Sequence, residues 1–247
     1  MIHIIAIEGL DGSGKTYLSE KLVDNIERCI GDKLVVVRQS FPMDRSHIID
    51  TCNKLLSGSD ATFLDNLNII DLFARDRKNW WNEINKKYKD ENRDILVVAD
   101  RYILSNPIYN VPAIIRNQYL PKKKAPYSDA YEYIKSHKND MTAIIDFVTR
   151  IVLDADRRTR RPEGTIFLNT KHSVRMKRLD ERGKRDVYEL EDMIKLEEMC
   201  IPQIMELSQT LKYTGNMKEV LTIPNERIID ELTTFVIRTI RLYGADC

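Results

Sequence analysis

The feature of this 247-residue chain that most restricts its fold is the segment Gly9-Leu10-Asp11-Gly12-Ser13-Gly14-Lys15-Thr16. It fits the phosphate-binding template G-x-x-x-x-G-K-[ST] and lies between the apolar run Ile4-Ile5-Ala6-Ile7 and a segment of helical periodicity. In such a strand, turn and helix, backbone N–H groups wrap a polyphosphate and the helix N-terminus adds partial positive charge. Lys15 would reach the outer phosphates, and Thr16 would offer its hydroxyl to Mg²⁺. The predicted residues of this nucleoside triphosphate site are Gly9, Asp11, Gly12, Ser13, Gly14, Lys15, Thr16 and Tyr17.

Composition and charge are those of an ordinary globular protein. Hydrophobic residues make up 43% of the chain, charged residues 31%, and the formal net charge is +1. This balance gives no reason to expect a nucleic acid or an anionic membrane as a partner. No apolar run approaches the roughly 20 residues of a membrane helix, and we expect no secretory signal and a cytoplasmic protein. The four cysteines are scattered and are expected to be reduced thiols: Cys29, Cys52, Cys200 and Cys247.

Apolar runs alternate along the chain with segments of helical periodicity. The runs predict five strands, at residues 4–7, 34–37, 95–99, 165–168 and 220–223. The expected helices cover residues 17–28, 47–56, 62–89, 127–156, 173–211 and 228–243. Prolines indicate loops and short turns over residues 106–124 instead. This order favours one α/β domain over residues 1–247, a three-layer fold with a five-stranded parallel sheet and helices on both faces.

Several chemistry-bearing segments meet at one edge of such a sheet. Ligands bind at the carboxyl ends of parallel strands, which brings Phe41-Pro42, Asp100-Arg101-Tyr102 and the segment after Leu168 close to the glycine-rich loop. An acidic residue that ends an apolar strand, as Asp100 does, is the arrangement that holds Mg²⁺ beside bound phosphates. The plainer alternative is that Asp100 caps the next turn.

Four segments resemble the thymidylate kinases, nucleoside monophosphate kinases with the P-loop NTPase fold. They are residues 7–16, Phe41-Pro42 with Arg45, Leu72-Phe73-Ala74-Arg75-Asp76-Arg77, and Asp100-Arg101-Tyr102 followed by Ser105 and Tyr109. These matches come in the family's order and at about its spacing, and they cover roughly residues 2–110. Pro162-Glu163-Gly164-Thr165 and the following apolar residues are similar to the strand that leads into the family's lid. The stretch from 110 to 161 is longer than the family leads us to expect, and it would form an oligomer contact or a helical arm.

The resemblance implies roles for single residues. Arg45, Arg77 and Arg101 would converge on the 5′-phosphate of the acceptor, where a planar guanidinium binds two oxygens at once. Phe73 would stack on a thymine ring, Asp11 would accept a hydrogen bond from the sugar 3′-hydroxyl, and Tyr188 would crowd the 2′ position. The expected acceptor site is completed by Phe41, Pro42, Ser105 and Tyr109.

Plainer readings of these residues stay open. Phe73 lies on an apolar helical face and would serve equally in the core. Asp11 would stabilise the loop turn, and Arg75 would replace Arg77 if the register of the helix differs by two residues.

Residues 173–190 form a candidate lid, a segment dense in both signs of charge. One reading is a solvated helix held by i,i+4 ion pairs, and the other is a mobile lid that closes cations over the transferring phosphoryl. Gly183 interrupts the segment as a hinge would. In the family an arginine commonly precedes a Tyr-Glu pair, but Val187 stands there in this chain. The catalytic cation therefore stays open among Arg178, Arg182, Lys184 and Arg185, with Arg182 and Arg185 favoured.

The implied reaction moves the γ-phosphoryl group of ATP to dTMP, with Mg²⁺, in a homodimer. The attacking oxygen already belongs to an anionic phosphate, so no general base is required. The nearest alternative is a deoxynucleoside kinase, whose base would be Glu8 or Asp100. A kinase for another deoxynucleotide such as dUMP and a non-catalytic nucleotide-binding module also stay open.

Overall fold

Five strands in one sheet form the centre of the protein. The computed structural model describes residues 1–56, 62–119, 136, 138–183, 191–221 and 224–241. The strands are β1 (Ile2–Gly9), β2 (Leu34–Ser40), β3 (Asp94–Asp100), β4 (Gly164–Leu168) and β5 (Asn216–Val220). Their spatial order is β2-β3-β1-β4-β5, and every neighbouring pair is parallel. The predicted five-stranded parallel sheet is confirmed, and the carboxyl ends of all its strands lie at one edge.

The fifth strand lies elsewhere than the apolar run at 220–223 predicts. It begins at Asn216 and ends at Val220, while residues 222–223 lie outside the described part of the chain. As an edge strand it is largely exposed, and polar residues such as Lys218 and Glu219 face solvent. A search for apolar runs finds buried strands, so it misplaced this one.

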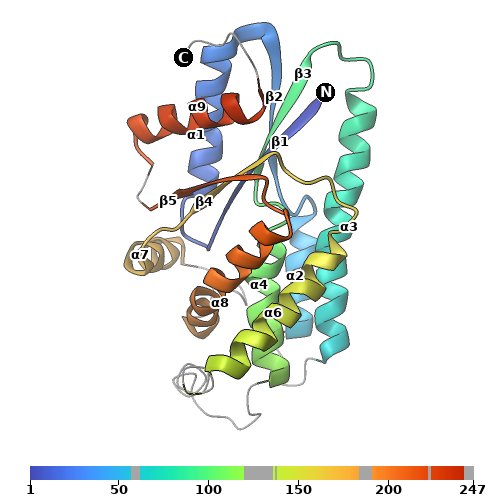
Figure 1. Ribbon diagram of the computed structural model, residues 1–247, viewed down its shortest axis with the longest axis vertical. Coiled ribbons are helices and arrows are strands. Elements are labelled where there is room, and N and C mark those ends of the chain that lie inside the picture. The colour runs from blue at the N-terminus through green and yellow to red at the C-terminus, as the bar shows by residue number, and fades with distance from the viewer. Residues whose placement is uncertain (57–61, 120–135, 137, 184–190, 222–223, 242–247) are drawn as a thin grey trace.

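Two helices cover one face of the sheet, α1 (Lys15–Ile30) and α9 (Glu226–Thr239). They lie against each other in Figure 1, and a 3₁₀ turn, Gly31–Lys33, joins α1 to β2. Leu22 of α1 and Val236 of α9 are fully buried in the apolar layer between the helices and the strands. Asn25 Nδ2 also donates a 2.9 Å hydrogen bond to Thr233 Oγ1, which fixes one helix against the other.

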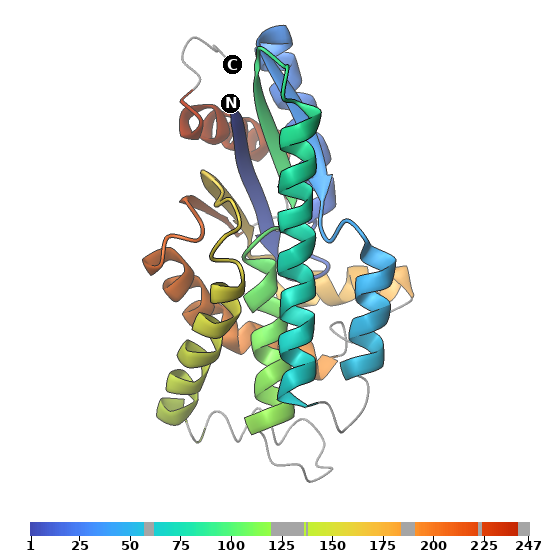
Figure 2. The same cartoon turned by 90° about the vertical axis from the view of Figure 1, so that its right-hand side faces the viewer.

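The opposite face is covered by α3 (Phe63–Lys87) and the end of α6 (Lys138–Ala155). Figure 2 shows α3 continuing past the strand ends into a second, helical half of the molecule. That half also contains α2 (Arg45–Leu56), α4 (Ser105–Ile114) and α8 (Glu191–Thr210), packed around a core of their own. The carboxyl edge of the sheet therefore faces a helical wall, and ligands can be enclosed between them.

Helix α4 corrects the expectation of loops over residues 106–124. All ten of its residues are buried against α3, α6 and α8. Pro107 is its third residue, where the backbone N–H has no intrahelical partner in any case. Pro112 lies further inside and costs about 3 kcal/mol, but each buried Ile or Val returns about 1.5–3 kcal/mol. Burial thus outweighs the proline penalty, and the helix passes into a π-helical turn, Ile115–Tyr119.

The predicted helix at 173–211 is two helices, α7 (His172–Arg182) and α8. Gly183 ends α7 with a φ of 81°, a left-handed conformation that favours glycine. The predicted helix at 127–156 is described from residue 138 as α6, and its earlier part falls largely outside the described residues. Among the helices described, none combines the length and the apolar character needed to cross a membrane.

Candidate active site

The phosphate loop joins β1 to α1 at the carboxyl edge of the sheet. Gly9, Gly12 and Gly14 have φ values of 145°, 76° and 99°, which residues other than glycine rarely adopt. Space is restricted as well, because a Cβ on Gly12 would lie 2.7 Å from the carbonyl oxygen of Arg175. Glycine is therefore required at position 12 both by backbone conformation and by the close approach of α7.

Lys15 is folded back onto this loop. Its Nζ donates hydrogen bonds to the carbonyls of Gly9 at 2.8 Å and Leu10 at 2.9 Å. Burial lowers the pKa of Lys15 to about 8, and the nearby positive charge of Arg101 acts in the same direction. An anion in the loop would reverse both effects by giving the ammonium group a charged partner.

Thr16 and Asp100, the metal pair predicted to hold Mg²⁺, are in direct contact. Thr16 Oγ1 donates a 2.7 Å hydrogen bond to Asp100 Oδ2 at the end of β3. A hydroxyl and a carboxylate oxygen side by side fit Mg²⁺, which takes oxygen ligands and completes its shell with water and phosphate. Arg38 Nη2 lies 3.6 Å from the same carboxylate and helps to hold it.

Arg101 leaves β3 in a left-handed conformation with a φ of 71°. Its guanidinium forms an ion pair with Asp11 and donates to the Tyr109 hydroxyl. Burial alone would raise the pKa of Asp11, but the charges of Arg101 and Lys15 outweigh it and hold that pKa well below its ordinary value. Asp11 is thus a permanent anion between the two cations.

Glu8 fixes the backbone that follows Arg101. It is fully buried, and its carboxylate accepts hydrogen bonds from Tyr102 N at 2.9 Å, Leu104 N at 3.0 Å and Ser105 Oγ at 2.5 Å. Burial is the main cause that raises the pKa of Glu8. A non-glycine residue at positive φ costs of order 1–3 kcal/mol, and these bonds hold Arg101 in that conformation.

Two adjoining cavities open at this edge of the sheet. The loop cavity is lined by residues of the phosphate loop, the metal pair and α7: Gly12, Gly14, Lys15, Thr16, Tyr17, Asp100, Arg178 and Arg182, among others. The acceptor cavity is lined by Pro42, Phe73, Arg77, Tyr102, Ser105, Tyr109 and Ile49. Four residues line both cavities: Asp11, Phe41, Arg45 and Arg101. A ligand in one cavity would therefore meet a ligand in the other at these four side chains.

Phe41 owes its place to an aromatic cluster beneath the cavities. Its ring lies edge-on to Trp80 at 5.0 Å between ring centres, and 5.3 Å from the ring of Tyr102. Two residues after Phe41, Met43 N donates a 2.9 Å hydrogen bond to Asp76 on α3. These contacts set the start of α2, which carries the exposed Arg45.

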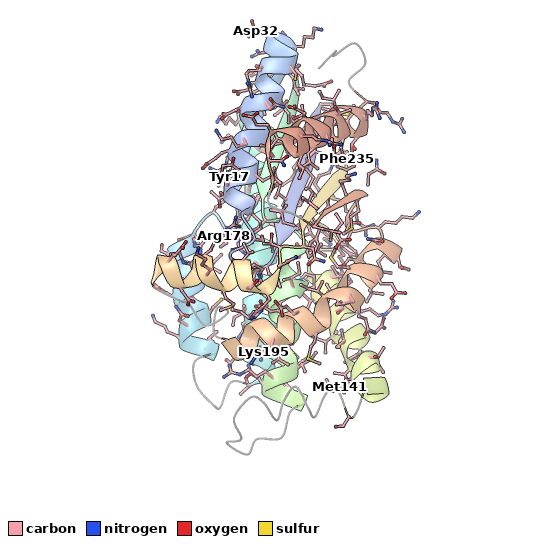
Figure 3. The ribbon with its side chains drawn as sticks, turned by 90° about the vertical axis from the view of Figure 1, so that its left-hand side faces the viewer. Tyr17, Asp32, Met141, Arg178, Lys195 and Phe235 are labelled. Carbon is pink, nitrogen blue, oxygen red and sulfur yellow. The ribbon has the colours of Figure 1, made fainter. Side chains whose placement is uncertain are left out.

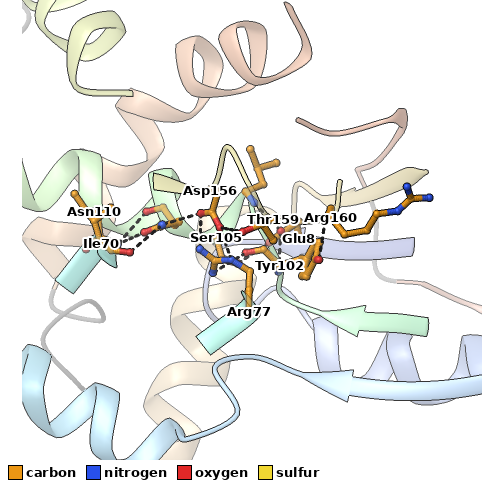
Figure 4. A network of polar contacts seen from close by, with 11 residues as sticks. Glu8, Ile70, Arg77, Tyr102, Ser105, Asn110, Asp156, Thr159 and Arg160 are labelled. Atoms are coloured by element: carbon orange, nitrogen blue, oxygen red, sulfur yellow. Dashed lines mark hydrogen bonds and ion pairs between the residues drawn. The ribbon is translucent and has the colours of Figure 1, made fainter. Parts of the chain in front are cut away.

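Arg77 lines the acceptor cavity and is held by the network of polar contacts that Figure 4 shows. Asp156 accepts from its Nε at 2.9 Å and its Nη2 at 2.5 Å, and the exposed fractions of the two side chains are 2% and 0%. Thr159 and Asn106 donate to the same carboxylate. The charge of Arg77 is thus already balanced within the protein, one helical turn from Phe73. Arg75, the alternative to Arg77, is exposed and pairs with Asp71 on the helix surface.

The start of the candidate lid lies against the phosphate loop. Figure 3 shows Arg178 on α7 beside the beginning of α1, near Tyr17, and Arg178 Nη1 donates to the Gly12 carbonyl at 2.9 Å. Arg182 lies one turn further along and also lines the loop cavity. Lys184, Arg185, Val187 and Tyr188 lie outside the described residues.

Three residues that shape the site are missing from the predicted set of site residues. The glutamate of the loop motif, Glu8, holds backbone rather than substrate, Asp156 pairs with Arg77, and buried Arg175 contacts the loop. The position of Glu8 in the motif is the one signal that draws attention to it in the sequence. Asp156 and Arg175 stand in charged stretches where nothing distinguishes them from solvated neighbours.

Comparison with known proteins agrees with this geometry. The sequence model of the family described as thymidylate kinase matches residues 7–126. A protein named "Probable thymidylate kinase 1" from Saccharolobus solfataricus is 27% identical over 156 residues, which are 62% of this chain and 69% of that protein. A "Probable thymidylate kinase" from Thermoplasma volcanium is 26% identical over 180 residues, 73% of this chain and 81% of the relative.

Solved structures share the fold. Thymidylate kinase from Candida albicans superposes with a TM-score of 0.55 at 21% identity, over 97% of this chain and 91% of that one. Deoxyadenosine kinase from M. mycoides with bound dCTP gives 0.51 at 17% identity, over 96% and 99%. The fold is thus common to kinases of nucleotides and of nucleosides. The two relatives matched by sequence, in contrast, are both named as probable thymidylate kinases. In its sequence motifs, its match to the family model over residues 7–126 and its fold, the chain is similar to the thymidylate kinases.

Proposed function

We propose that the protein is a thymidylate kinase that transfers the γ-phosphoryl group of ATP to dTMP, giving dTDP and ADP. The observation that carries this proposal is the junction of the two cavities. A phosphate-binding loop with a metal pair opens on one side, a cavity with an aromatic side chain opens on the other, and Asp11, Arg45 and Arg101 stand between them. Two anionic phosphates would meet where two arginines neutralise their repulsion.

The acceptor cavity has a phosphate end and a base end. The phosphate end is the junction, where Arg45 and Arg101 would bind the 5′-phosphate of dTMP. The base end is lined by Phe73, whose ring would stack on thymine, and by Arg77. The resemblance implies that Arg77 binds the 5′-phosphate. Because Asp156 already balances its charge, Arg77 would instead meet the edge of the base as a hydrogen-bond donor.

Catalysis would consist of positioning and charge neutralisation. Lys15, released from the loop carbonyls, would bind the outer phosphates of ATP, and Arg101 would hold the attacking oxygen of dTMP in line. Thr16 and Asp100 would hold Mg²⁺, whose chemistry when bound is neutralisation of phosphate charge. The candidate lid would supply further positive charge from Arg182, and from Arg185, which lies outside the described residues. Closure of the lid over the substrates would exclude water.

In the described part of the site, three carboxylates are already engaged, so none of them is a free general base for a nucleoside acceptor. Glu8 is saturated by two backbone N–H groups and the Ser105 hydroxyl, and Asp100 accepts from Thr16. Asp11 is paired with Arg101. A monophosphate acceptor needs no base, so the arrangement favours dTMP over thymidine. The homodimer, the cytoplasmic location and the 2′-side role of Tyr188 stay predictions.

An acceptor panel tests the proposal. The purified protein is given ATP and Mg²⁺ with dTMP, dUMP, dCMP, dGMP, dAMP or thymidine, and ADP release is measured with product identification by chromatography. The proposal expects dTDP from dTMP at the highest kcat/KM. Turnover of thymidine but not dTMP would move the protein to the nucleoside kinases, and turnover of dUMP above dTMP would change the assigned acceptor.

A further inference from the structure

The carbonyl oxygens of five successive loop residues are all hydrogen-bonded by side chains. Those of Gly9 and Leu10 accept from Lys15. The next three accept from the segment that links β4 to α7 and from α7 itself. Arg175 Nε donates to Asp11 O at 2.9 Å, Arg178 Nη1 to Gly12 O at 2.9 Å, and Thr170 Oγ1 to Ser13 O at 3.0 Å.

These bonds determine which way the loop's N–H groups face. In a trans peptide the carbonyl of one residue and the N–H of the next point in opposite directions, and the structure has its cis peptide at Phe41-Pro42, outside the loop. Holding the Asp11 carbonyl towards α7 and the Ser13 carbonyl towards Thr170, just before α7, therefore turns the N–H groups of Gly12 and Gly14 away from these partners. Gly12 and Gly14 line the loop cavity. That is the orientation in which a loop binds phosphate.

Arg175 is built into this contact. It is 2% exposed, and its Nη1 donates to Glu198 Oε1 on α8 at 2.6 Å, which fixes the guanidinium beneath the loop. Its Nη2 is buried and has no hydrogen-bond partner among the described residues. A buried donor left over costs about 1–3 kcal/mol, so stability alone does not explain an arginine at this position.

We propose that Arg175 and Thr170 are positioning residues that preset the phosphate loop for ATP by holding the Asp11 and Ser13 peptide groups. The inference rests on the proposed function only in naming ATP as the ligand of the loop. Both residues act through the loop backbone, since neither lines the loop cavity or the acceptor cavity. Arg178 does line the loop cavity and would touch ATP itself, so it is a poor test of positioning.

Two pairs of variants separate positioning from packing. Arg175→Met keeps the apolar stem and removes the donors, whereas Arg175→Lys keeps a charge and one reachable partner. Thr170→Val is nearly isosteric and removes the hydroxyl, whereas Thr170→Ser restores it. The matched control is Thr165→Val. Thr165 lies on β4, the strand that leads to Thr170, and its Oγ1 donates to a carbonyl remote from the loop, Thr214 O at 2.6 Å.

The readout is the Kd of Mg²⁺-ATP by calorimetry, with the KM values for ATP and dTMP and the melting temperature of each variant. We expect the Kd for ATP to rise about tenfold in Thr170→Val and Arg175→Met, the effect of one hydrogen bond of about 1.4 kcal/mol. Thr170→Ser should return to the wild-type Kd, Arg175→Lys should recover part of it, and the KM for dTMP should change little. Thr165→Val should lower the melting temperature as much as Thr170→Val and leave the Kd unchanged.

Wild-type ATP affinity in Thr170→Val and Arg175→Met would overturn the inference, and so would an equal loss of affinity in Thr165→Val. A wild-type protein that binds ATP but turns over none of the acceptors would contradict the proposed function instead. The Kd comparison would still decide the role of Thr170 and Arg175.

Discussion

Thr16 and Asp100 stand 84 residues apart in the chain and are joined by a 2.7 Å hydrogen bond between Thr16 Oγ1 and Asp100 Oδ2. The parallel pairing of β1 with β3 brings them together, because it aligns the end of one strand with the end of the other. The bond places a hydroxyl and a carboxylate side by side, where they would hold Mg²⁺ next to the phosphate loop.

Asp100→Asn should impair metal binding. Loss of the carboxylate charge is expected to lower kcat/KM about 100-fold, or about 2.7 kcal/mol, and to raise the Mg²⁺ concentration needed for half-maximal rate. A Mg²⁺ titration of the steady-state rate measures both. Asp90→Asn, at an exposed position, is the control. Equal Mg²⁺ dependence in wild type and Asp100→Asn would show that Asp100 only caps the turn.

Affinity for ATP should fall as the pH rises through about 8. The pKa of Lys15 in the free protein is lowered to about 8 by burial first and by Arg101 second, so its ammonium group is lost above that pH. Binding of ATP favours the charged form and must then take up a proton. We expect the Kd for ATP to rise up to about tenfold per pH unit between roughly pH 8 and 10. Lys15→Arg should bind more weakly but without this slope, and a flat profile in the wild type would contradict the prediction.

The buried ion pair of Arg77 with Asp156 should be needed for stability. Asp156→Asn leaves an unbalanced buried guanidinium and is expected to lower the free energy of unfolding by about 3–5 kcal/mol. The double variant Arg77→Met with Asp156→Leu should recover much of that loss in urea denaturation. Asp146→Asn, which breaks an exposed pair with Arg150, should change stability by less than about 1 kcal/mol. A double variant no more stable than Asp156→Asn would contradict this account.

Phe73 should matter for the acceptor and not for ATP. Phe73→Ala is expected to raise the KM for dTMP about tenfold, because it removes both the stacking surface and about 0.5–1.5 kcal/mol of aromatic contact. The Kd for ATP should stay within about twofold of the wild-type value. Phe63→Ala is the matched control, since Phe63 is partly buried on the same helix but does not line the acceptor cavity. If both variants raise the KM equally, Phe73 serves the core.

The sequence predicted the sheet and the phosphate loop well, because both depend on local patterns. Buried parallel strands read as apolar runs, and a glycine template reports its own backbone conformation. Local patterns failed where tertiary contacts decide, as in α4, whose prolines are outweighed by burial on every side. On α3 the adjacent tryptophans Trp80 and Trp81 look alike in the sequence, and only the tertiary packing distinguishes them. Trp80 is the more buried tryptophan, at 3% exposure, because it packs on Phe41 and Tyr102.

Ion pairs between residues far apart in the chain could not be predicted from the sequence either. The register of α3 indicates that Arg77 faces the site, but its partner Asp156 comes from the end of α6, 79 residues later. The pairing of Arg175 with Glu198 likewise depends on how α7 lies on α8. Neither partner stands in a motif, and each looks like its charged neighbours.

The most direct test of the account is to follow the label of [γ-³²P]ATP with dTMP as acceptor, in the wild type and in Arg101→Ala. We predict that the label appears in dTDP, and that Arg101→Ala lowers kcat/KM by about 1000-fold or more, the effect of an arginine that stabilises a phosphoryl transition state. Label that stays in ATP or passes only to water, with ATP bound normally, would contradict the assignment of the protein as a thymidylate kinase.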